Sequence, residues 1–286
     1  MNTYAWATDI HLDALGTDDD AIMDFGKFLV KDSPHGVFLT GDLSNAKKVV
    51  YHLSLLEKAC ERPIYFVLGN HDFYGSSVEH IRKTMRELSN MSQYLKYMPT
   101  TQYVSLTPST ALIGHDGWYD ALYGDYKASR FIMNDWIDIK EFADINSVTK
   151  DVTGWSMEPA WTPRYPIIAK QAQALAMEAV KHVHDSIKAA ARYHKTMIIL
   201  THFPPFEESH IYQGKVGDPG AQPWYTSKLM GDLLRQASTA YPNVRFEVFC
   251  GHTHGKFDGQ ITKNLFCHVG GAEYMRPALQ SLIQVP

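Results

Sequence analysis

The chain has 286 residues, of which 45% are hydrophobic and 20% are charged, and its formal net charge at pH 7 is -4. This composition is typical of a globular protein that is long enough to bury its own core without disulfides or a structural metal. This slightly acidic net charge gives no sign of the excess of lysine and arginine with which proteins bind long nucleic acids or anionic membrane surfaces.

Short runs of apolar, β-branched and aromatic residues, each followed by a polar turn, predict buried strands along the chain. In chain order, these runs lie at 3–8, 36–40, 63–68, 111–114, 196–201 and 245–250. Weaker strand signals lie at 103–106 and 259–271.

Helical patterns alternate with the strand signals. They span 17 or 18 to 31, 46–60, 76–90, 167–192 and 227–238. Ser44 or Asn45 is the expected N-cap of the second helix. The alternation of strands and helices predicts an α/β fold with a largely central sheet.

Residues 118–166 interrupt this alternation, because they are rich in Trp, Tyr and Asp but show no sustained period. We interpret them as an insertion within a single domain that spans residues 1–286. The insertion either folds over a site like a cap or packs around its own aromatic side chains on the surface.

Cysteine usage and apolar run lengths predict the cellular environment. Cys60, Cys250 and Cys267 are odd in number and lack CxxC spacing, which favours buried, reduced thiols over disulfides or a thiolate metal site. The N-terminus shows no secretory signal pattern, and no apolar stretch reaches the roughly 18 residues of a membrane span. We therefore expect a soluble, cytoplasmic protein.

Polar motifs stand directly after five of the predicted strands. They are Asp9-Ile10-His11, Gly41-Asp42, Gly69-Asn70-His71-Asp72, His202-Phe203-Pro204-Pro205 and Gly251-His252-Thr253-His254. Ligands of open α/β sheets bind beyond the carboxyl ends of the strands, so these side chains are expected to meet at one rim. His182 and His184 also form an H-x-H pair, but they lie inside a predicted helix and are interpreted as solvated.

The combined series D-x-H, G-D, G-N-H-D, H-x-P-P and G-H-x-H resembles the calcineurin-like metallophosphoesterases. The resemblance implies a four-layer α/β/β/α sandwich with two facing mixed sheets. It also implies a dinuclear metal site with the ligands Asp9, His11, Asp42, Asn70, His202, His252 and His254. Asp42 would bridge the two ions, the first of which would also be held by Asp9, His11 and His254.

Imidazole and carboxylate ligands without thiolates suit manganese, iron or zinc, and we expect two such ions, most simply Mn²⁺. Two metals roughly 3.5–4 Å apart clamp an in-line displacement at phosphorus. The resemblance implies attack by a metal-bridging hydroxide, with His71 as the general acid that protonates the leaving oxygen. The alternative for His71 is a hydrogen bond to a metal ligand, without contact to the substrate.

Two departures narrow the predicted activity. Serine/threonine protein phosphatases of this superfamily carry G-D-x-V-D-R-G and G-N-H-E, whereas this chain has Asn45 in place of the second acid and Asp72 in place of the glutamate. Asn45 would be left to orient His71. These differences count against a protein phosphatase and favour a hydrolase of a small phosphodiester, cyclic-nucleotide-like or similar, with Asp42 and His71 as catalytic residues.

Other functions remain as alternatives. One is a phosphomonoesterase acting on a small metabolite, another is a nuclease for short oligonucleotides, and the third is a non-catalytic metal-binding interaction module. The complete set of histidines counts against the third.

The residues that contact the substrate are left open by the sequence. His115, Asp116 and His268 follow predicted strands and are either near the site or engaged in local hydrogen bonds. Candidate phosphate ligands are Arg130, Arg164 and Arg276. Aromatic residues that either stack on the substrate or pack within the insertion are Trp118, Tyr123, Trp155 and Trp161.

Overall fold

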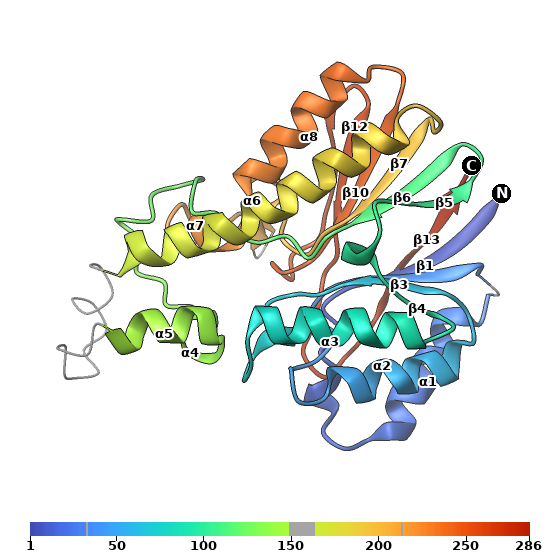
Figure 1. Cartoon of the computed structure of the whole chain (residues 1–286), viewed down its shortest axis with the longest axis horizontal. Coiled ribbons are helices and arrows are strands. Elements are labelled where there is room, and N and C mark those ends of the chain that lie inside the picture. Colours follow the sequence, from blue (N-terminus) through green and yellow to red (C-terminus); the bar gives the residue numbers. More distant parts are fainter. Residues whose placement is uncertain (33, 149–163, 213) are drawn as a thin grey trace.

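The computed structural model describes residues 1–286 except 33, 149–163 and 213. Two sheets pack face to face, and helices cover the outer side of each, so the fold has four layers (Figure 1). This is the α/β/β/α sandwich with two mixed sheets that the motifs predict.

The first sheet has the strand order β13-β1-β2-β3-β4. Its strands are β1 (Asn2–Ala7), β2 (Gly36–Thr40), β3 (Ile64–Val67), β4 (Leu95–Tyr97) and β13 (Leu279–Val285). β1 to β4 are parallel, and β13 adds an antiparallel edge beside β1. Every residue of β2 is buried, which is why this strand reads as a continuous apolar run. The helices on this side are α1 (Asp19–Val30), α2 (Val49–Cys60) and α3 (Val78–Met91).

The second sheet has the strand order β11-β12-β10-β7-β6-β5. Its strands are β5 (Val104–Thr107), β6 (Thr110–Gly114), β7 (Thr196–Leu200), β10 (Arg245–Cys250), β11 (Phe257–Thr262) and β12 (Leu265–Val269). The four inner strands are parallel, and both edge strands are antiparallel. The long helix α6 (Tyr165–Ala190) and α8 (Lys228–Ala240) cover this sheet.

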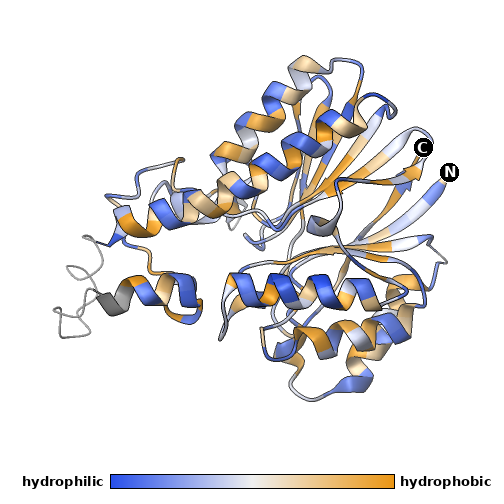
Figure 2. Ribbon diagram, in the orientation of Figure 1, coloured by the Kyte–Doolittle hydropathy of each residue, from blue (hydrophilic) through white to orange (hydrophobic). Residues whose placement is uncertain are grey.

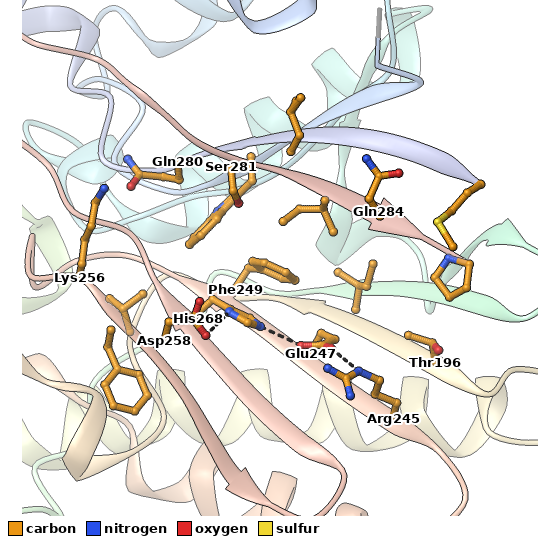
Figure 3. Close-up of a pocket in the computed structure, with 18 residues that line it drawn as sticks. Thr196, Arg245, Glu247, Phe249, Lys256, Asp258, His268, Gln280, Ser281 and Gln284 are labelled. Atoms are coloured by element: carbon orange, nitrogen blue, oxygen red, sulfur yellow. Dashed lines mark hydrogen bonds and ion pairs between the residues drawn. The ribbon is translucent and has the colours of Figure 1, made fainter. Parts of the chain in front are cut away.

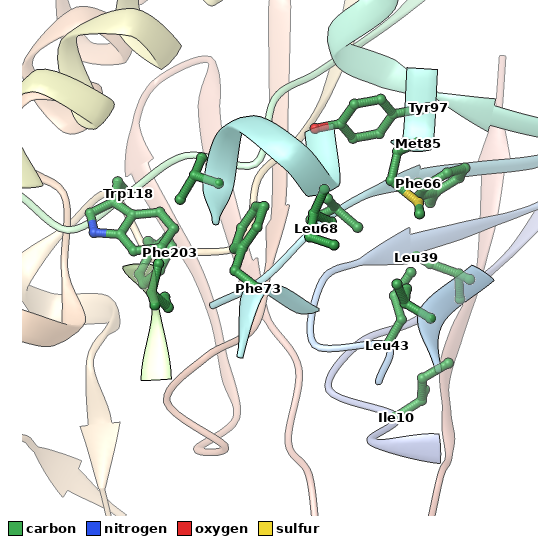
Figure 4. Close-up of a cluster of buried hydrophobic side chains, with 14 of the residues drawn as sticks. Ile10, Leu39, Leu43, Phe66, Leu68, Phe73, Met85, Tyr97, Trp118 and Phe203 are labelled. Carbon is green, nitrogen blue, oxygen red and sulfur yellow. The ribbon is translucent and has the colours of Figure 1, made fainter. Parts of the chain in front are cut away.

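The apolar core lies between the layers, where the inner strands and the inner faces of the helices are hydrophobic (Figure 2). Between the sheets, the Trp6 ring meets the Phe249 ring edge-on at 4.9 Å. Beyond the first sheet, the core continues through Phe73 and Trp118 to Phe203 (Figure 4). The start of the predicted insertion is therefore part of the main core and not a detached surface excursion.

Short elements complete the chain. The helices are α4 (Asp135–Asp138), α5 (Lys140–Val148) and α7 (Gln222–Tyr225), and a small hairpin joins β8 (Ile211–Tyr212) to β9 (Lys215–Val216). The single 3-10 turns are η1 (Leu12–Leu15), η2 (His71–Phe73), η3 (Met98–Thr100) and η4 (Glu207–Ser209). No helix in the described ranges is long and apolar enough to cross a lipid bilayer.

Most predicted strands and helices are found within two residues of their expected bounds, and four differences have physical reasons. α2 begins at Val49 without a side-chain cap, because Ser44 hydrogen-bonds His52 and Asn45 bonds Asp13 and the Lys47 N–H. The stretch 259–271 divides into β11 and β12 around a turn. β4 and β13 were not predicted, since β4 is only three residues long and β13 is a half-exposed edge strand. The three cysteines are buried.

Candidate metal centre

The predicted metal ligands lie at one rim of the sandwich, in the loops that follow β1, β2, β3, β7 and β10. One donor atom from each of Asp9, His11, Asp42 and His254 lies within 4.8 Å of the others, and the same holds for Asp42, His202 and His252. The Asn70 side-chain oxygen lies 3.2 Å from His202 Nε2. The structure therefore brings all seven residues together, with Asp42 shared by the two groups.

Strained backbone is concentrated at these residues. Among the non-glycine residues that the structure describes, eight have a positive φ, and five of them are predicted ligands. The five φ values are 48° at Asp9, 38° at His11, 50° at Asp42, 69° at His252 and 55° at His254. Left-handed backbone costs a non-glycine residue on the order of 1 kcal/mol or more, so the surrounding contacts must compensate for it. Such strain is typical of functional sites.

The glycines of the motifs allow these side chains to approach closely. A Cβ atom on Gly69 would lie 2.2 Å from a carboxylate oxygen of Asp42, and one on Gly251 would lie 2.0 Å from a carboxylate oxygen of Asp9. Real Cβ atoms do not approach other atoms so closely. The glycines in G-N-H-D and G-H-x-H are therefore required by the packing of the site itself.

Hydrogen bonds tie the ligand loops to one another. The buried Asp72 carboxylate accepts the backbone N–H groups of Leu43, Ser44 and Gly69 at 2.8–3.0 Å, which joins the second motif to the third. Asp9 accepts the backbone N–H of His252 at 2.9 Å and so joins the two sheets. This bridging role of Asp72 was not predicted from the motif.

The electrostatics of the site show a shortage of positive charge. Burial alone would raise the pKa of Asp42, but His202, His71 and His11 outweigh it and hold the pKa well below its usual range. Burial alone would lower the pKa of His202, but Asp42 and then Asp9 raise it to about 9. The two buried carboxylates thus favour a protonated His202. In a donor set of this kind, a bound metal cation supplies that positive charge in place of the proton.

The donor atoms also have the chemistry of a metal site. Nε2 of His11 faces Nε2 of His254 at 3.2 Å, and neutral imidazole nitrogens that face each other so closely need a shared cation or proton. Nδ1 of His202 is hydrogen-bonded to the Thr40 carbonyl oxygen at 2.8 Å, which leaves Nε2 to face the centre. Carboxylates, imidazoles and an amide oxygen fit two first-row divalent cations.

Two residues outside the predicted set support Asn70. The Asn70 Nδ2 group donates to Asp135 Oδ1 at 2.8 Å and to the Tyr74 hydroxyl at 3.0 Å, and that hydroxyl donates to Asp135 Oδ1 at 2.7 Å. The Asn70 oxygen is thereby turned toward His202. Asp135 is fully buried, and burial raises its pKa. No local pattern marks Asp135, because it lies in the aperiodic segment 118–166.

His71 lies at the edge of the centre, with about a quarter of its side chain exposed. Its backbone N–H donates to Asp42 Oδ1 at 2.9 Å, and its Nε2 lies 3.9 Å from Asp42 Oδ2. The Tyr74 ring packs against its ring with centroids 4.4 Å apart. The expectation that Asn45 orients His71 is wrong, since the Asn45 side chain bonds Asp13 and the backbone N–H of Lys47.

A cavity of about 560 Å³ opens above the metal ligands. Its floor includes Asp42, Asn70, His71, His252 and His254. Three segments form the wall: residues 131–134, residues around the β8–β9 hairpin and α7, and the loop that carries Tyr274. No lysine or arginine is present among the described residues that line it.

The remaining candidates lie elsewhere. His115 accepts the Gly117 N–H, which is the local hydrogen bond that was one of its two predicted roles. Asp116 instead bonds residues far away in sequence, since it pairs with Arg82 at 2.8 Å and accepts the Leu68 N–H. His182 packs half-buried against His115, contrary to its interpretation as solvated, whereas His184 is exposed.

His268 does not line the rim of the metal centre. It bonds Glu247 at 2.8 Å and Asp258 at 3.2 Å in a separate cleft between the sheets, also lined by Arg245 (Figure 3). Trp118 is fully buried in the core, and Trp155 and Trp161 lie outside the described residues. Arg130, Arg164 and Tyr123 are not among the residues that line the cavity. Arg276 lines a different depression beside Asp9 and His254.

Comparisons with known proteins agree with this geometry. The family model for calcineurin-like phosphoesterases matches residues 3–256. No curated protein matches the sequence. A phosphopantetheinyl hydrolase from Mycobacterium tuberculosis has a similar structure, with a TM-score of 0.60 and 15% identity, over 94% of this chain and 89% of that one. A dimetal phosphatase from Danio rerio gives a TM-score of 0.55 and 14% identity, over 94% and 87% of the two chains.

At these identities, the two structures support the fold alone. The family match covers most of the chain, and the motifs that it spans converge on one buried Asp/His centre. The chain therefore belongs to the calcineurin-like phosphoesterase family and is a metal-dependent phosphoesterase.

Proposed function

We propose that this protein hydrolyses small phosphodiesters with two metal ions held by the seven predicted ligands, and that Asp42 and His71 are its catalytic residues. A diester is favoured over a monoester because no lysine or arginine is present among the described residues that line the cavity. Among the described residues of its outer part, Asp218 is the carboxylate, and it adds negative charge.

The charge of the substrate decides between ester classes. A phosphomonoester carries about -1.5 to -2 charges at pH 7, whereas a diester carries one. Beyond the metals, the described cavity offers no cation to balance a second charge, and Asp218 would repel it. The same argument disfavours substrates with additional phosphates, such as nucleoside diphosphates and triphosphates.

The chain's own residues have defined tasks in this reaction. The ligands Asp9, His11, Asp42 and His254 would hold one ion, and Asp42, Asn70, His202 and His252 the other, for which we propose Mn²⁺. Bound there, the ions would polarise the ester and supply a water of lowered pKa. His71 faces the same cavity, and its ring can donate a proton to the leaving oxygen.

A phosphomonoesterase is the second candidate, because one observation favours it. A shallow depression of about 390 Å³ lies on the outer side of Asp9 and His254 and contains Lys256 and Arg276. Arg276 is 79% exposed in its side chain and is paired with Glu273 at 3.1 Å. Glu273 thus offsets one of the two positive charges, and Lys256 supplies the other. Because His71 lines the main cavity and not this depression, the diester is the better-supported substrate.

A paired substrate panel tests the proposal. Metal-free protein is loaded with Mn²⁺, and bis(4-nitrophenyl) phosphate and 4-nitrophenyl phosphate are compared by kcat/KM, with Asp42→Asn as the control. We expect faster hydrolysis of the diester and loss of both activities in the control. A higher kcat/KM for the monoester would contradict the diester assignment. Hydrolysis of neither ester by protein that holds two ions would favour the binding-module alternative.

A further inference from the structure

We infer that the wall of the cavity is a binding subsite for a planar, heteroatom-bearing ring on an alcohol group of the phosphodiester, and that His210 hydrogen-bonds that ring. The inference rests on the proposed function, because it places the ring next to the phosphorus held at the metal centre. It assigns a role to the cavity wall, which the metal-centre chemistry does not use.

Exposed apolar side chains gather around this cavity from three separate segments. Phe131 and Ile132 are each 37% exposed, Tyr212 is 63% exposed and Tyr274 is 55% exposed. All four line the cavity. Tyr274 also packs against the ring of His11 with centroids 4.5 Å apart, so the aromatic wall begins directly at the metal ligands. Such a wall, in which aromatic and aliphatic side chains stand beside a small set of polar groups such as Asn134 and His210, is typical of a pocket for a flat organic group.

His210 is the unusual polar residue in this wall. It is only 3% exposed, and its Nδ1 is buried without a hydrogen-bond partner. Among the described residues, no hydrogen bond is found at its Nε2 either. A buried polar group that is left unpaired costs about 1–3 kcal/mol, and a wall that needed only shape would have an apolar side chain here.

The position of His210 is held by its neighbours. Its ring stacks on Tyr225 with centroids 5.2 Å apart and an interplanar angle of 4°. Gly217 also lies against the ring, where a Cβ atom would come within 2.3 Å of the imidazole. The Gly217 N–H donates to the His210 carbonyl oxygen at 2.8 Å. The imidazole is therefore packed in one orientation, with Nδ1 enclosed by protein and Nε2 left as the nitrogen that can face the cavity.

The charge state of His210 indicates what kind of group it binds. Burial lowers its pKa to about 4, although Asp218 acts in the opposite direction. The ring is neutral at pH 7 and offers one donor and one acceptor. The two nitrogens point in different directions, so only Nε2 can meet the ligand. It can donate to or accept from one heteroatom of a ring such as a nucleobase, which a plain phenyl group does not offer, and a neutral imidazole brings no charge for a second phosphate.

Three diesters that share one leaving group separate the parts of this inference. They are the 4-nitrophenyl diesters of phosphate with methanol, phenol and thymidine (through its 5′-hydroxyl), and hydrolysis is followed by release of 4-nitrophenolate in Mn²⁺-loaded protein. We expect kcat/KM to be at least about tenfold higher for the thymidine ester than for the methyl ester, which is the effect of one hydrogen bond plus ring contact. The phenyl ester should lie between them.

The variant His210→Phe keeps the stacked ring but removes its nitrogens. It should reduce the advantage of the thymidine ester about tenfold and leave the methyl ester unchanged. His210→Gln, which retains a donor and an acceptor, should preserve part of the advantage. His184→Phe, at an exposed position of α6, is the matched control and should change nothing.

Several outcomes would overturn the inference while leaving the phosphodiesterase assignment intact. They are equal rates for the methyl and thymidine esters, an advantage for the phenyl ester alone, and an unchanged thymidine advantage in His210→Phe. A binding measurement does not depend on turnover: thymidine 5′-methyl phosphate should bind metal-loaded His71→Ala protein about tenfold more tightly when His210 is present than when it is Phe. Equal affinities would likewise reject the role of His210.

Discussion

The floor and the wall of the cavity are built in different ways. The floor consists of loops that directly follow buried strands and are tied together by Asp72, Asp9 and the close approach of Gly69 and Gly251. The wall comes from the β8–β9 hairpin, the segment 131–134 and the loop around Tyr274, and many of its side chains are exposed. The comparison indicates that buried, hydrogen-bonded loops position the metal ligands, whereas less buried segments shape the space above them.

A hydrogen bond of Asp135 joins the two regions, in addition to the ring contact between Tyr274 and His11. Asp135 begins α4, directly after the wall residues 131–134, and its carboxylate holds the side chain of the predicted ligand Asn70. The segment that shapes the wall is thus also a support of the floor. The following variants test how far floor and wall can be separated.

The largest effect is expected at the floor, for His71→Ala. A positioned general acid contributes about 10²–10⁴-fold to the rate, so kcat should fall by that factor, while KM changes little. Because His71 is not among the predicted metal ligands, metal analysis should still find two ions per chain. Unchanged turnover would show that His71 does not donate the proton, and loss of an ion would make it a ligand.

An intermediate effect is expected at the contact between wall and floor, for Asp135→Asn. Asn70 and Tyr74 both donate to Asp135 Oδ1, and an amide oxygen accepts these two bonds without the carboxylate's negative charge, so the Asn70 side chain is held less firmly. Partners of metal ligands are typically worth 10–100-fold in metal affinity or activity, and we expect weaker Mn²⁺ binding in this range by calorimetry.

Asp138→Asn is the matched control, since Asp138 lies exposed at the other end of the same short helix. Equal Mn²⁺ affinities of the two variants and the wild type would show that the wall does not support the floor.

The smallest effect on catalysis is expected for Asp120→Asn, whose consequence should be seen in stability. Burial raises the pKa of Asp120 to about 6 from 3.8, even though the backbone N–H groups of Leu229 and Leu122 donate to it. Because the folded pKa lies above the unfolded one, the carboxylate destabilises the fold increasingly as pH rises from about 4 to 6. The shift corresponds to at most about 3 kcal/mol.

Urea unfolding at pH 4.5 and 7.5 measures this effect. The variant should gain stability relative to the wild type at the higher pH, and Mn²⁺ affinity should stay the same. A pH-independent difference between the two proteins would contradict the raised pKa.

The sequence by itself determined the strands, the order of the motifs and the identity of the side chains that meet at the metal centre. This was possible because each motif follows a strand whose apolar run is local, and parallel strands deliver their carboxyl ends to one edge. The sequence around Asn45 departs from the protein-phosphatase signature, but the partners of the Asn45 side chain could not be read from it.

Only the tertiary structure decided the surroundings of those ligands. Asp135 reaches Asn70 across 65 positions of sequence, and Tyr225 of α7 stacks on His210, which lies before β8. β13 likewise pairs with β1 from the opposite end of the chain. Contacts of this kind depend on how separate segments pack against each other. They cannot be predicted from the periodicity or the motif spacing within one segment.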